Sequence, residues 1–364
     1  MGSIRFLDIH TLGIIVTYNC NLDCVYCYIS NKRDKRISLE SAGNILEPFL
    51  NCEGDVLQVL LIGGEPLLCY SQIKELILWV ENGNWKRKCI FFMSTNGTLL
   101  NEEMKAWFST HNKIITLALS YDGIAAIQNS NRSNSSSLID LDYFLRNWPR
   151  QKIQMTVNAT SVSRMAEGVL YLLQLGFLVN VNVAYEETPW SVKCIREYAR
   201  QLQKIGEYYL ENPPLEPIYQ FQHPYEEYAN EINFPTHQKK QCGAGEGYIV
   251  FDMDGKPYAC HMLSPLVMND KTPEIPDVFQ LRICEDIRCQ ACPYIIDCPT
   301  CIGCNWRYRG DYVARDKTHC VLMQIEVMIA MKYELKRIAR YGRCNEDDKM
   351  IFAIEKLMAF NHSK

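Results

Sequence analysis

The stretch LGIIVTYNCNLDCVYC, residues 12–27, joins a strand-like run to three closely spaced cysteines. Residues 12–18 are apolar and rich in β-branched side chains, which is typical of a strand buried on both faces of a parallel sheet. Cys20, Cys24 and Cys27 follow, with three and then two residues between them. Since parallel sheets carry their chemistry at the carboxyl ends of the strands, we expect the three thiols at such an end.

Five more strand-like runs alternate with amphipathic segments. The predicted strands are residues 56–62, 88–94, 114–120, 152–158 and 178–184, and the predicted helices are residues 38–50, 70–82, 101–109, 138–147, 163–174 and 190–210. Six such βα units predict an α/β fold with a parallel sheet, curved like part of a barrel.

The sequence predicts that the whole chain has four parts. Residues 1–210 form the barrel, and 211–241 form a linker that begins with the helix-breaking ENPPLEPIY. Residues 242–320 form a cysteine-rich domain, and 321–364 form helices that cap the barrel. The polar run SNRSNSSS, residues 130–137, is expected to be a loop that does not pack.

Composition narrows the class of protein. The 364 residues are 48% hydrophobic and carry a formal net charge of −4, so there is no electrostatic argument for nucleic acid or an anionic membrane as a partner. No apolar run reaches the ~20 residues of a membrane span, and the first ten residues lack the apolar core of a signal peptide. We expect a cytoplasmic protein.

Seventeen cysteines are unusual for such a protein. Disulfides are rare in a reducing compartment, so the clustered cysteines predict metal or cluster ligands. The scattered ones are expected to be small buried residues or bystanders, namely Cys52, Cys69, Cys89, Cys194 and Cys344.

Three thiolates in one loop suit a four-iron cluster with one iron left open for a ligand. The alternative is a zinc loop whose fourth ligand lies elsewhere. The spacing Cys20-x3-Cys24-x2-Cys27, with Tyr26 before the last cysteine, resembles the signature of radical S-adenosylmethionine (radical SAM) enzymes. GGEP, residues 63–66, resembles that family's motif for the methionine end of the cofactor.

The resemblance covers residues 12 to about 210 and implies a partial (βα)6 barrel. It also implies a 4Fe–4S cluster whose open iron chelates S-adenosylmethionine, and cleavage of this cofactor to a 5′-deoxyadenosyl radical that abstracts a substrate hydrogen.

Several strand-end residues are candidates to bind the cofactor. Gly63 and Gly64 let the backbone approach its amino group, Glu65 is an acceptor for that ammonium, and Pro66 fixes the turn. Three further strand-end polar groups, Asn96, Ser120 and Asp122, are candidates to reach the ribose or carboxylate. By resemblance, Ser120 and the later Arg132 are carboxylate ligands, and an exposed loop arginine is the alternative for Arg132.

The second cysteine group, in residues 242–320, contains paired CxxC motifs, which indicate metal binding. Zinc ribbons are one reading, although no basic stripe accompanies them. CGAGEGYIVFDMDGKPYACH, residues 242–261, predicts a strand–turn–strand hairpin. With the later cysteines it resembles the SPASM extension of radical SAM enzymes that modify peptides, which implies two auxiliary 4Fe–4S clusters and three in all.

The resemblance assigns the ligands in two sets. The inner set is Cys242, Cys260 and Cys301, Cys304 or both; the outer set is Cys289, Cys292, Cys298 and Cys320. The chain departs from the family pattern at Ile302, where a cysteine is usual. With both Cys301 and Cys304 bound, the inner cluster has no open iron; with one, it has. Cys284 is a further candidate or a bystander.

His261 directly follows Cys260. In sulfatase-maturing relatives, the position that resembles this one holds an Asp thought to act as a base. His261 is therefore either a catalytic proton acceptor or a structural residue. Tyr18, Tyr121 and Tyr185 either shape a substrate pocket or pack in the core.

The main interpretation is a radical SAM/SPASM enzyme that modifies a ribosomally made precursor peptide by a thioether link, a carbon–carbon crosslink or related chemistry. The alternatives are an anaerobic sulfatase-maturase-like enzyme and a zinc-ribbon binding protein. Expected partners are the peptide or protein substrate and an electron donor such as flavodoxin or ferredoxin. With strand one at about residue 12, we expect no leader-binding domain ahead of the barrel. Leader recognition then comes from a separate small protein or the aromatic run PIYQFQHPYEEY, residues 217–228, or does not occur; simple packing is the alternative for that run.

Overall fold

The computed structural model describes residues 9–184, 186, 189–230, 242–245, 247–269, 289, 292–298, 300–345 and 347–362. These residues form two compact units. The first contains Met1–Gln154 and Gly243–Leu281, and the second contains Met155–Cys242 and Arg282–Lys364. The domain boundaries expected from the sequence pattern remain a proposal. Tyr185 and Cys284 lie outside the described residues.

The first unit is built on four parallel strands in the order β4-β3-β2-β1. Their bounds are Thr11–Thr17 for β1, Leu57–Gly63 for β2, Cys89–Thr95 for β3 and Ile115–Leu119 for β4. The predicted strands are confirmed within two residues at each end. Parallel pairing in sequence order brings the carboxyl ends of all four strands to one edge of the sheet.

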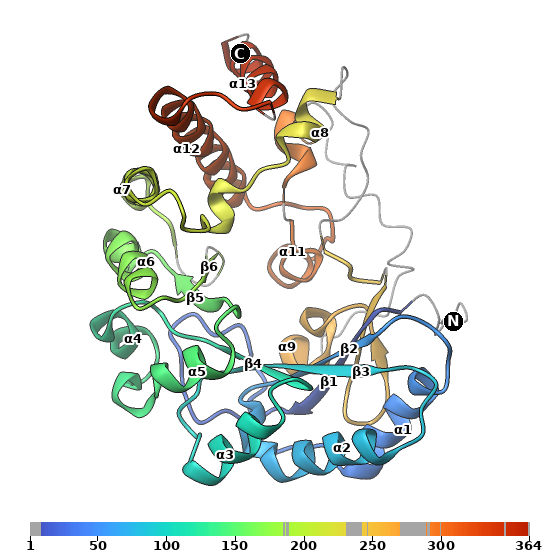
Figure 1. Cartoon of the computed structure of the whole chain (residues 1–364). Helices are drawn as coiled ribbons and strands as arrows, with labels where there is room; N and C mark the ends of the chain where they lie inside the picture. The colour runs from blue at the N-terminus through green and yellow to red at the C-terminus, as the bar shows by residue number, and fades with distance from the viewer. Residues whose placement is uncertain are drawn as a thin grey trace. The chain divides into compact units, whose positions relative to one another are not determined.

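Three helices follow these strands and lie along one face of the sheet (Figure 1). They are α1 (Leu39–Leu50), α2 (Tyr70–Asn82) and α3 (Glu102–Thr110). Helix α1 begins where Ser38 accepts a hydrogen bond from the backbone N–H of Ser41, and it buries apolar side chains such as Leu46 and Phe49. Burial of this apolar face stabilises the helix against the sheet.

The prediction for residues 130–137 was wrong. Helix α4 (Ala125–Asn131) extends into this run, and α5 (Leu141–Asn147) follows it. Asn131, Arg132 and Ser135 are buried although polar. Their burial is possible because they have hydrogen-bond partners: Ser135, for example, accepts from the Gln128 side chain at 2.8 Å.

The predicted hairpin is confirmed as β7 (Tyr248–Phe251) and β8 (Pro257–Tyr258), and it joins the sheet on the free side of β1. Strand β7 runs parallel to β1, with Thr11 opposite Tyr248. The Tyr18 hydroxyl donates to Asp252 Oδ2 at 2.8 Å. Tyr18 is fully buried and Tyr121 nearly so, which confirms core packing for both.

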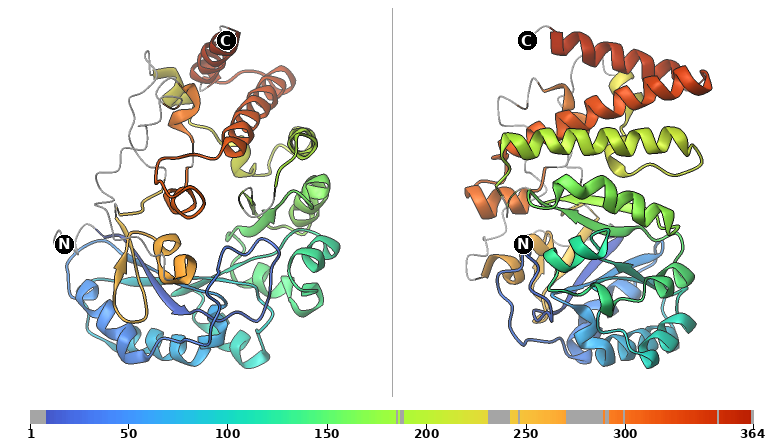
Figure 2. Two further views of the ribbon diagram at one scale, coloured as in Figure 1. Left: turned by 180° about the vertical axis from the view of Figure 1, so that it is seen from behind. Right: turned by 90° about the vertical axis from the view of Figure 1, so that its left-hand side faces the viewer.

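The second unit contains a two-stranded sheet, β5 (Ile153–Val157) with β6 (Val179–Val183), and mostly helices. The helices are α6 (Met165–Gln174), α7 (Val192–Glu211), α8 (Tyr225–Asn230), α11 (Ile302–Arg309), α12 (Lys317–Tyr341) and α13 (Asp347–His362); α9 (Pro265–Met268) belongs to the first unit. Helices α7, α12 and α13 lie side by side (Figure 2). The two predicted C-terminal helices are confirmed.

The aromatic run 217–228 contributes to the core of the second unit. Phe221 is 3% exposed and its ring meets those of Tyr209 and Tyr333 edge to face. A peptide therefore cannot dock on Phe221 in this structure, and packing explains the residue. Tyr219 remains 37% exposed.

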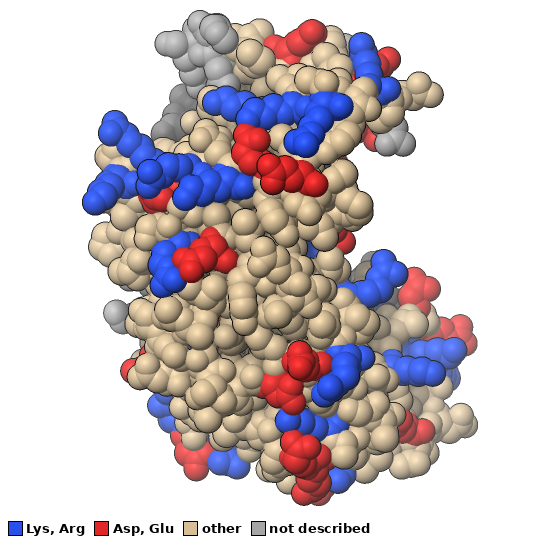
Figure 3. All heavy atoms as spheres, turned by 60° about the vertical axis from the view of Figure 1, so that its left-hand side comes forward, with Lys and Arg blue, Asp and Glu red and all other residues tan. Residues whose placement is uncertain are grey.

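No helix in the described part of the chain is both long and apolar enough to cross a membrane. On the face shown in Figure 3, Lys and Arg side chains lie in small groups with Asp and Glu, and uncharged surface separates these groups.

Candidate active site

The three-cysteine loop begins directly after β1, at the carboxyl edge of the sheet. The Leu22 N–H donates to Cys20 Sγ at 3.5 Å, and the Cys27 N–H donates to the Cys24 carbonyl at 3.0 Å. The three thiols interact electrostatically with one another. Burial raises the pKa of Cys20, and raises that of Cys24 to about 11. Both are therefore protonated until a cation binds, and binding iron would release protons.

The last residue of α4 and the polar residues after it hold this loop in place. The Val25 N–H donates to the Asn131 carbonyl at 3.0 Å, and the Asp23 N–H donates to Ser133 Oγ at 2.9 Å. Ser133 adopts a positive φ of 54°. This role is not evident from the sequence, because the composition of the run alone is typical of an unpacked loop.

Gly63 and Gly64 lie so close to the backbone that follows β1 that a side chain at either position would clash with it. A Cβ at Gly63 would lie 2.5 Å from the Thr17 carbonyl oxygen, and one at Gly64 would lie 2.3 Å from the Asn19 carbonyl oxygen and 2.9 Å from Cys20 Cβ. The absence of side chains therefore lets the end of β2 approach the start of the cysteine loop.

Glu65 is almost fully buried between the ends of β2 and β3. Its carboxylate accepts from the Leu67 N–H at 3.1 Å, the Thr95 hydroxyl at 2.7 Å and the Asn96 N–H at 2.8 Å. Burial raises its pKa. A carboxylate has about four acceptor positions, so these three donors leave room for one more, such as an ammonium group. Pro66 begins the 3-10 turn Pro66–Cys69 that follows.

Asn96 and Ser120 lie at the ends of β3 and β4, as predicted. The Asn96 amide donates to Asn21 Oδ1 at 3.0 Å, and its oxygen accepts from the Thr98 N–H and hydroxyl. The Ser120 N–H donates to the Thr95 carbonyl at 2.9 Å. Contact of either side chain with a cofactor stays a prediction.

Asp122, Tyr26 and Arg132 form one buried network beside the cysteines. The fully buried Asp122 carboxylate accepts from the Tyr26 hydroxyl, from Asn131 Nδ2 at 3.0 Å and from Arg132 Nη2 at 3.1 Å. The guanidinium of Arg132 lies over the Tyr26 ring, with its carbon 5.3 Å from the ring centroid. Burial lowers the pKa of Arg132, but Asp122 and its other neighbours more than offset this, so the residue stays charged.

Two features of this network suit an anionic ligand group. Arg132 Nε is buried and has no hydrogen-bond partner among the described residues. The same cation interacts electrostatically with Cys24. Lys32, which the sequence pattern does not single out, interacts electrostatically with Cys20 and Cys27 and donates to the Leu22 carbonyl at 3.0 Å. Arg132 lowers the pKa of Cys24 and Lys32 lowers that of Cys20, but burial outweighs both effects.

His261 lies against the residue that follows the cysteine loop. Its Nε2 is 3.4 Å from the Tyr28 hydroxyl, and the ring centroids are 5.8 Å apart. Its Nδ1 is buried without a hydrogen-bond partner among the described residues. Burial lowers the pKa of His261 to about 4, so the imidazole is neutral at pH 7.

The second unit brings the predicted outer cysteines together. Cys298 interacts electrostatically with Cys320, Cys292 and Cys289, in that order of strength. Burial raises the pKa of Cys298 to about 12. Four thiols are the donor set of a structural zinc site or of a 4Fe–4S cluster, and ligation by these four stays a prediction.

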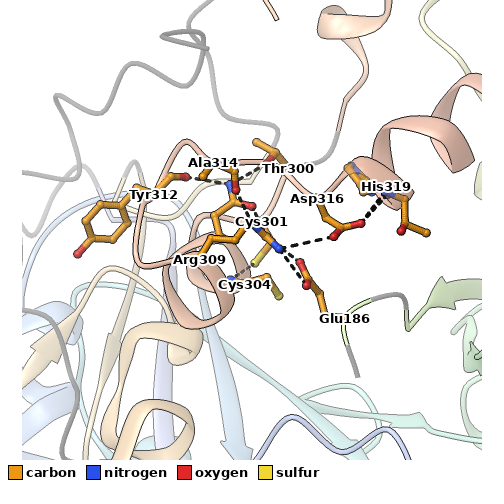
Figure 4. Close-up of polar contacts among 11 residues, drawn as sticks. Glu186, Thr300, Cys301, Cys304, Arg309, Tyr312, Ala314, Asp316 and His319 are labelled. Atoms are coloured by element: carbon orange, nitrogen blue, oxygen red, sulfur yellow. Dashed lines mark hydrogen bonds and ion pairs between the residues drawn. The ribbon is translucent and has the colours of Figure 1, made fainter. Parts of the chain in front are cut away.

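Cys301 and Cys304 lie at the start of α11 (Figure 4). The Cys304 N–H donates to Cys301 Sγ at 3.5 Å, and a hydrogen bond with the Cys304 side chain lowers the pKa of Cys301. At the other end of this helix, Arg309 binds both carboxylate oxygens of Glu186, at 2.7 and 3.0 Å. This ion pair ties α11 to the segment after β6.

The inner ligand set is divided between the units. Cys260 belongs to the first, and Cys242, Cys301 and Cys304 belong to the second, so this set stays a prediction. Among the residues that the structure describes, no group of three or more His, Cys, Asp or Glu side chains lies at distances suited to holding one metal ion.

Comparison with known proteins identifies the N-terminal segment. Residues 14–126 match the family model of the radical SAM superfamily. An uncharacterized protein of Methanocaldococcus jannaschii, MJ0907, is 26% identical over 212 residues, which are 54% of this chain and 72% of that protein. The cysteine-type anaerobic sulfatase-maturating enzyme of Clostridium perfringens strain 13 is 33% identical over 131 residues, which are 33% of this chain and 34% of that enzyme. The chain thus matches only about a third of the length of this relative.

Solved structures share the fold over most of the chain. Tagged anSMEcpe with bound AdoMet superposes with a TM-score of 0.69 at 18% identity, covering 95% of this chain and 98% of that one. Streptococcus suis SuiB bound to the precursor peptide SuiA gives a TM-score of 0.60 at 17% identity, covering 86% and 76%. The expected α/β fold with a parallel sheet and a cysteine-rich C-terminal region is confirmed.

Proposed function

We propose that this chain, which carries a radical SAM domain, is a SPASM-type enzyme that abstracts a hydrogen from a ribosomally made peptide and leaves a thioether, a carbon–carbon crosslink or a related modification. The observation that carries the proposal is that the loop with Cys20, Cys24 and Cys27 and the turn with Glu65 lie at the same edge of the sheet. Cys20 interacts electrostatically with Glu65 as well as with Cys27.

The residues at this edge have the chemistry that the cluster and its cofactor need. When bound, the 4Fe–4S cluster and S-adenosylmethionine together supply a 5′-deoxyadenosyl radical. The three thiols would hold the cluster, and Glu65 would accept from the cofactor ammonium group at its remaining position. Arg132 would donate its unpaired Nε–H to the carboxylate. Asp122 has three partners already, so it would act by positioning Tyr26 and Arg132.

The outer cysteines support auxiliary-cluster binding. Cys298 interacts electrostatically with Cys289, Cys292 and Cys320 in the second unit, and these four are the set inferred from the SPASM resemblance. An inner cluster on Cys242, Cys260 and Cys301 or Cys304 completes the proposal. A reducing protein such as flavodoxin or ferredoxin would supply electrons, and a separate small protein or no protein would recognise the leader of the peptide.

His261 is the proposed proton acceptor. Its neutral ring and unpartnered Nδ1 leave a position for a proton from the substrate, and Tyr28 fixes the other side of the ring. Its lowered pKa makes it a weak base, so the position of the ring contributes more than its basicity.

Metal analysis and cofactor cleavage test the proposal. Protein purified without oxygen should contain about twelve irons, four for each of three clusters, and little zinc. With dithionite and S-adenosylmethionine it should release 5′-deoxyadenosine. Replacing Cys20, Cys24 and Cys27 together by Ala should remove one cluster and abolish this release. Release that persists in the triple variant, or zinc in place of iron, contradicts the proposal.

Sulfatase maturation is the second candidate, favoured by the 33% identity to the Clostridium perfringens enzyme. His261 in place of an Asp weakens it. The two candidates differ in substrate: a Cys- or Ser-containing sulfatase peptide against a short precursor encoded beside this protein. Mass spectrometry of both peptides after incubation with the holoenzyme distinguishes them, because only the true substrate changes in mass.

A further inference from the structure

Arg315 is a buried cation in direct contact with one of the outer cysteines. It lies in the segment between α11 and α12 and is 5% exposed. Its Nη1 lies 2.8 Å from Cys298 Sγ, which is close for a hydrogen bond between nitrogen and sulfur. Nothing in the sequence pattern singles out this residue, because a lone arginine near a helix start is ordinary.

A thiolate suits this position better than a thiol. A buried cation is costly unless an anion or good acceptors accompany it. An iron-bound Cys298 supplies negative charge at the distance where Arg315 can donate a charge-assisted hydrogen bond. The contact therefore fits a metal-bound state of Cys298.

The neighbourhood supplies a second nitrogen. His319 Nε2 lies 3.7 Å from the same sulfur, and His319 directly precedes Cys320. Arg315 and His319 thus approach Cys298 from the segment that also carries Cys320. Hydrogen bonds to ligand sulfurs and nearby charge are main determinants of the potential of an iron–sulfur cluster.

We propose that Arg315 raises the reduction potential of the outer auxiliary cluster by donating a hydrogen bond and placing positive charge at the Cys298 sulfur. The inference rests on the proposed function, since it requires Cys289, Cys292, Cys298 and Cys320 to hold a 4Fe–4S cluster. On reduction the cluster gains one electron and no bond is made or broken. A cation at a ligand sulfur stabilises the more negative, reduced state, so the outer cluster becomes a better electron acceptor.

The test is a redox titration of the anaerobic holoenzyme, with dithionite as the reductant and electron paramagnetic resonance as the readout. The variants are Arg315→Gln, Arg315→Lys and the control Lys317→Gln. The control removes the same charge from an exposed side chain two residues away. In Arg315→Gln one auxiliary signal should titrate at a potential about 59 mV lower, a tenfold change for a one-electron couple. Arg315→Lys should give a smaller shift, and the control should match wild type.

Iron content separates redox tuning from a structural role. The proposal expects all irons to remain in at least Arg315→Lys, with the potential shifted. Unchanged potentials in both variants with full iron overturn it. Loss of four irons from both variants also overturns it, because Arg315 would then serve assembly alone. Neither result affects the proposed function, which is tested separately by the iron content of wild-type protein and by 5′-deoxyadenosine release in the triple cysteine variant.

Discussion

The hydroxyl of Tyr28 lies 3.4 Å from Nε2 of His261, and each residue directly follows a predicted cluster ligand, Cys27 and Cys260. Both residues belong to the first compact unit. The contact therefore links the cysteine loop after β1 to the end of the β7–β8 hairpin, two parts of the chain separated by more than two hundred residues.

Replacing His261 by Gln should separate cofactor cleavage from product formation. Loss of a positioned proton acceptor costs about a hundredfold or more in rate, whereas the three-cysteine loop and the Glu65 turn stay intact. We expect 5′-deoxyadenosine release to continue while modified peptide falls about a hundredfold or more. Tyr28→Phe removes only the hydroxyl and should cause a smaller loss. Full product formation by His261→Gln would mean that the residue is structural.

Replacing Gly64 by Ala should disrupt the cofactor edge of the sheet. The new Cβ would meet the Asn19 carbonyl and Cys20 Cβ, and such overpacking costs about 1–3 kcal/mol. We expect a lower melting temperature and fewer irons at the N-terminal cluster. Gly43→Ala is the matched control, because a Cβ at this position in α1 meets nothing within 4 Å. Equal behaviour of the two variants contradicts the steric argument.

Replacing Asp122 by Asn should leave the buried Arg132 cation without its counter-charge. Breaking a buried ion pair on one side costs about 3–5 kcal/mol, so we expect a clear fall in unfolding free energy, measured by urea denaturation. The double variant Asp122→Asn with Arg132→Gln removes both charges and should recover part of the loss. If the double variant recovers stability but still does not bind S-adenosylmethionine, as measured by calorimetry, this would support a ligand role for Arg132. A double variant no more stable than the single one would argue against the pair.

Glu326 should make the second unit less stable as the pH rises. Burial raises its pKa from an unfolded value of 4.5 to about 7, and it accepts a hydrogen bond from Tyr198 at 2.5 Å. The protonated form is favoured in the fold, so the stabilisation is present below pH 4.5 and lost as the pH passes 7.

Glu326→Gln provides the comparison, because its amide oxygen still accepts from Tyr198 but does not titrate. Between pH 5 and pH 8 the variant should gain on wild type by about 3 kcal/mol at most. Denaturation curves at the two values measure the gain. Parallel pH profiles for the two proteins would show that Glu326 is ionised in the fold throughout.

Replacing Cys304 by Ala should show whether the inner cluster is fully ligated. If Cys301 and Cys304 both bind it, no iron is open and the cluster serves electron transfer. The variant should then keep uncoupled cofactor cleavage but show a shifted cluster potential and slower turnover. Twelve irons with full product formation in the variant would establish that Cys304 is no ligand.

The strands and the cysteine motifs could be predicted from the sequence because each depends on neighbouring residues. The run 12–18 is continuously apolar, and the spacing of Cys20, Cys24 and Cys27 is local. The roles of Arg132 and Lys32 were harder to find. Arg132 lies in a run whose composition is typical of an exposed loop, and its burial depends on Asp122, which lies just beyond the end of β4.

Contacts between residues far apart in the sequence could not be predicted either. The hairpin was predicted from the strand–turn–strand pattern of residues 242–261, which resembles the SPASM extension, but its place beside β1 depends on residues far away in the chain. The packing of Phe221 against Tyr209 and Tyr333 likewise depends on helices elsewhere in the sequence. An aromatic run alone does not distinguish a docking surface from a core.

The pairing of β1 with β7 also sets the order in which the protein can be assembled during translation. The ribosome releases the N-terminal strands first, but the sheet gains its neighbour for β1 only once residues 248–251 have emerged. Until then β1 is an edge strand with unpaired backbone groups, ready to pair with another nascent chain. Iron delivered to the cysteine loop in that interval would reach a site whose supporting sheet still lacks β7. Cluster insertion should therefore follow release of the chain, and a truncated chain that ends before β7 should aggregate with its cysteines unmetallated.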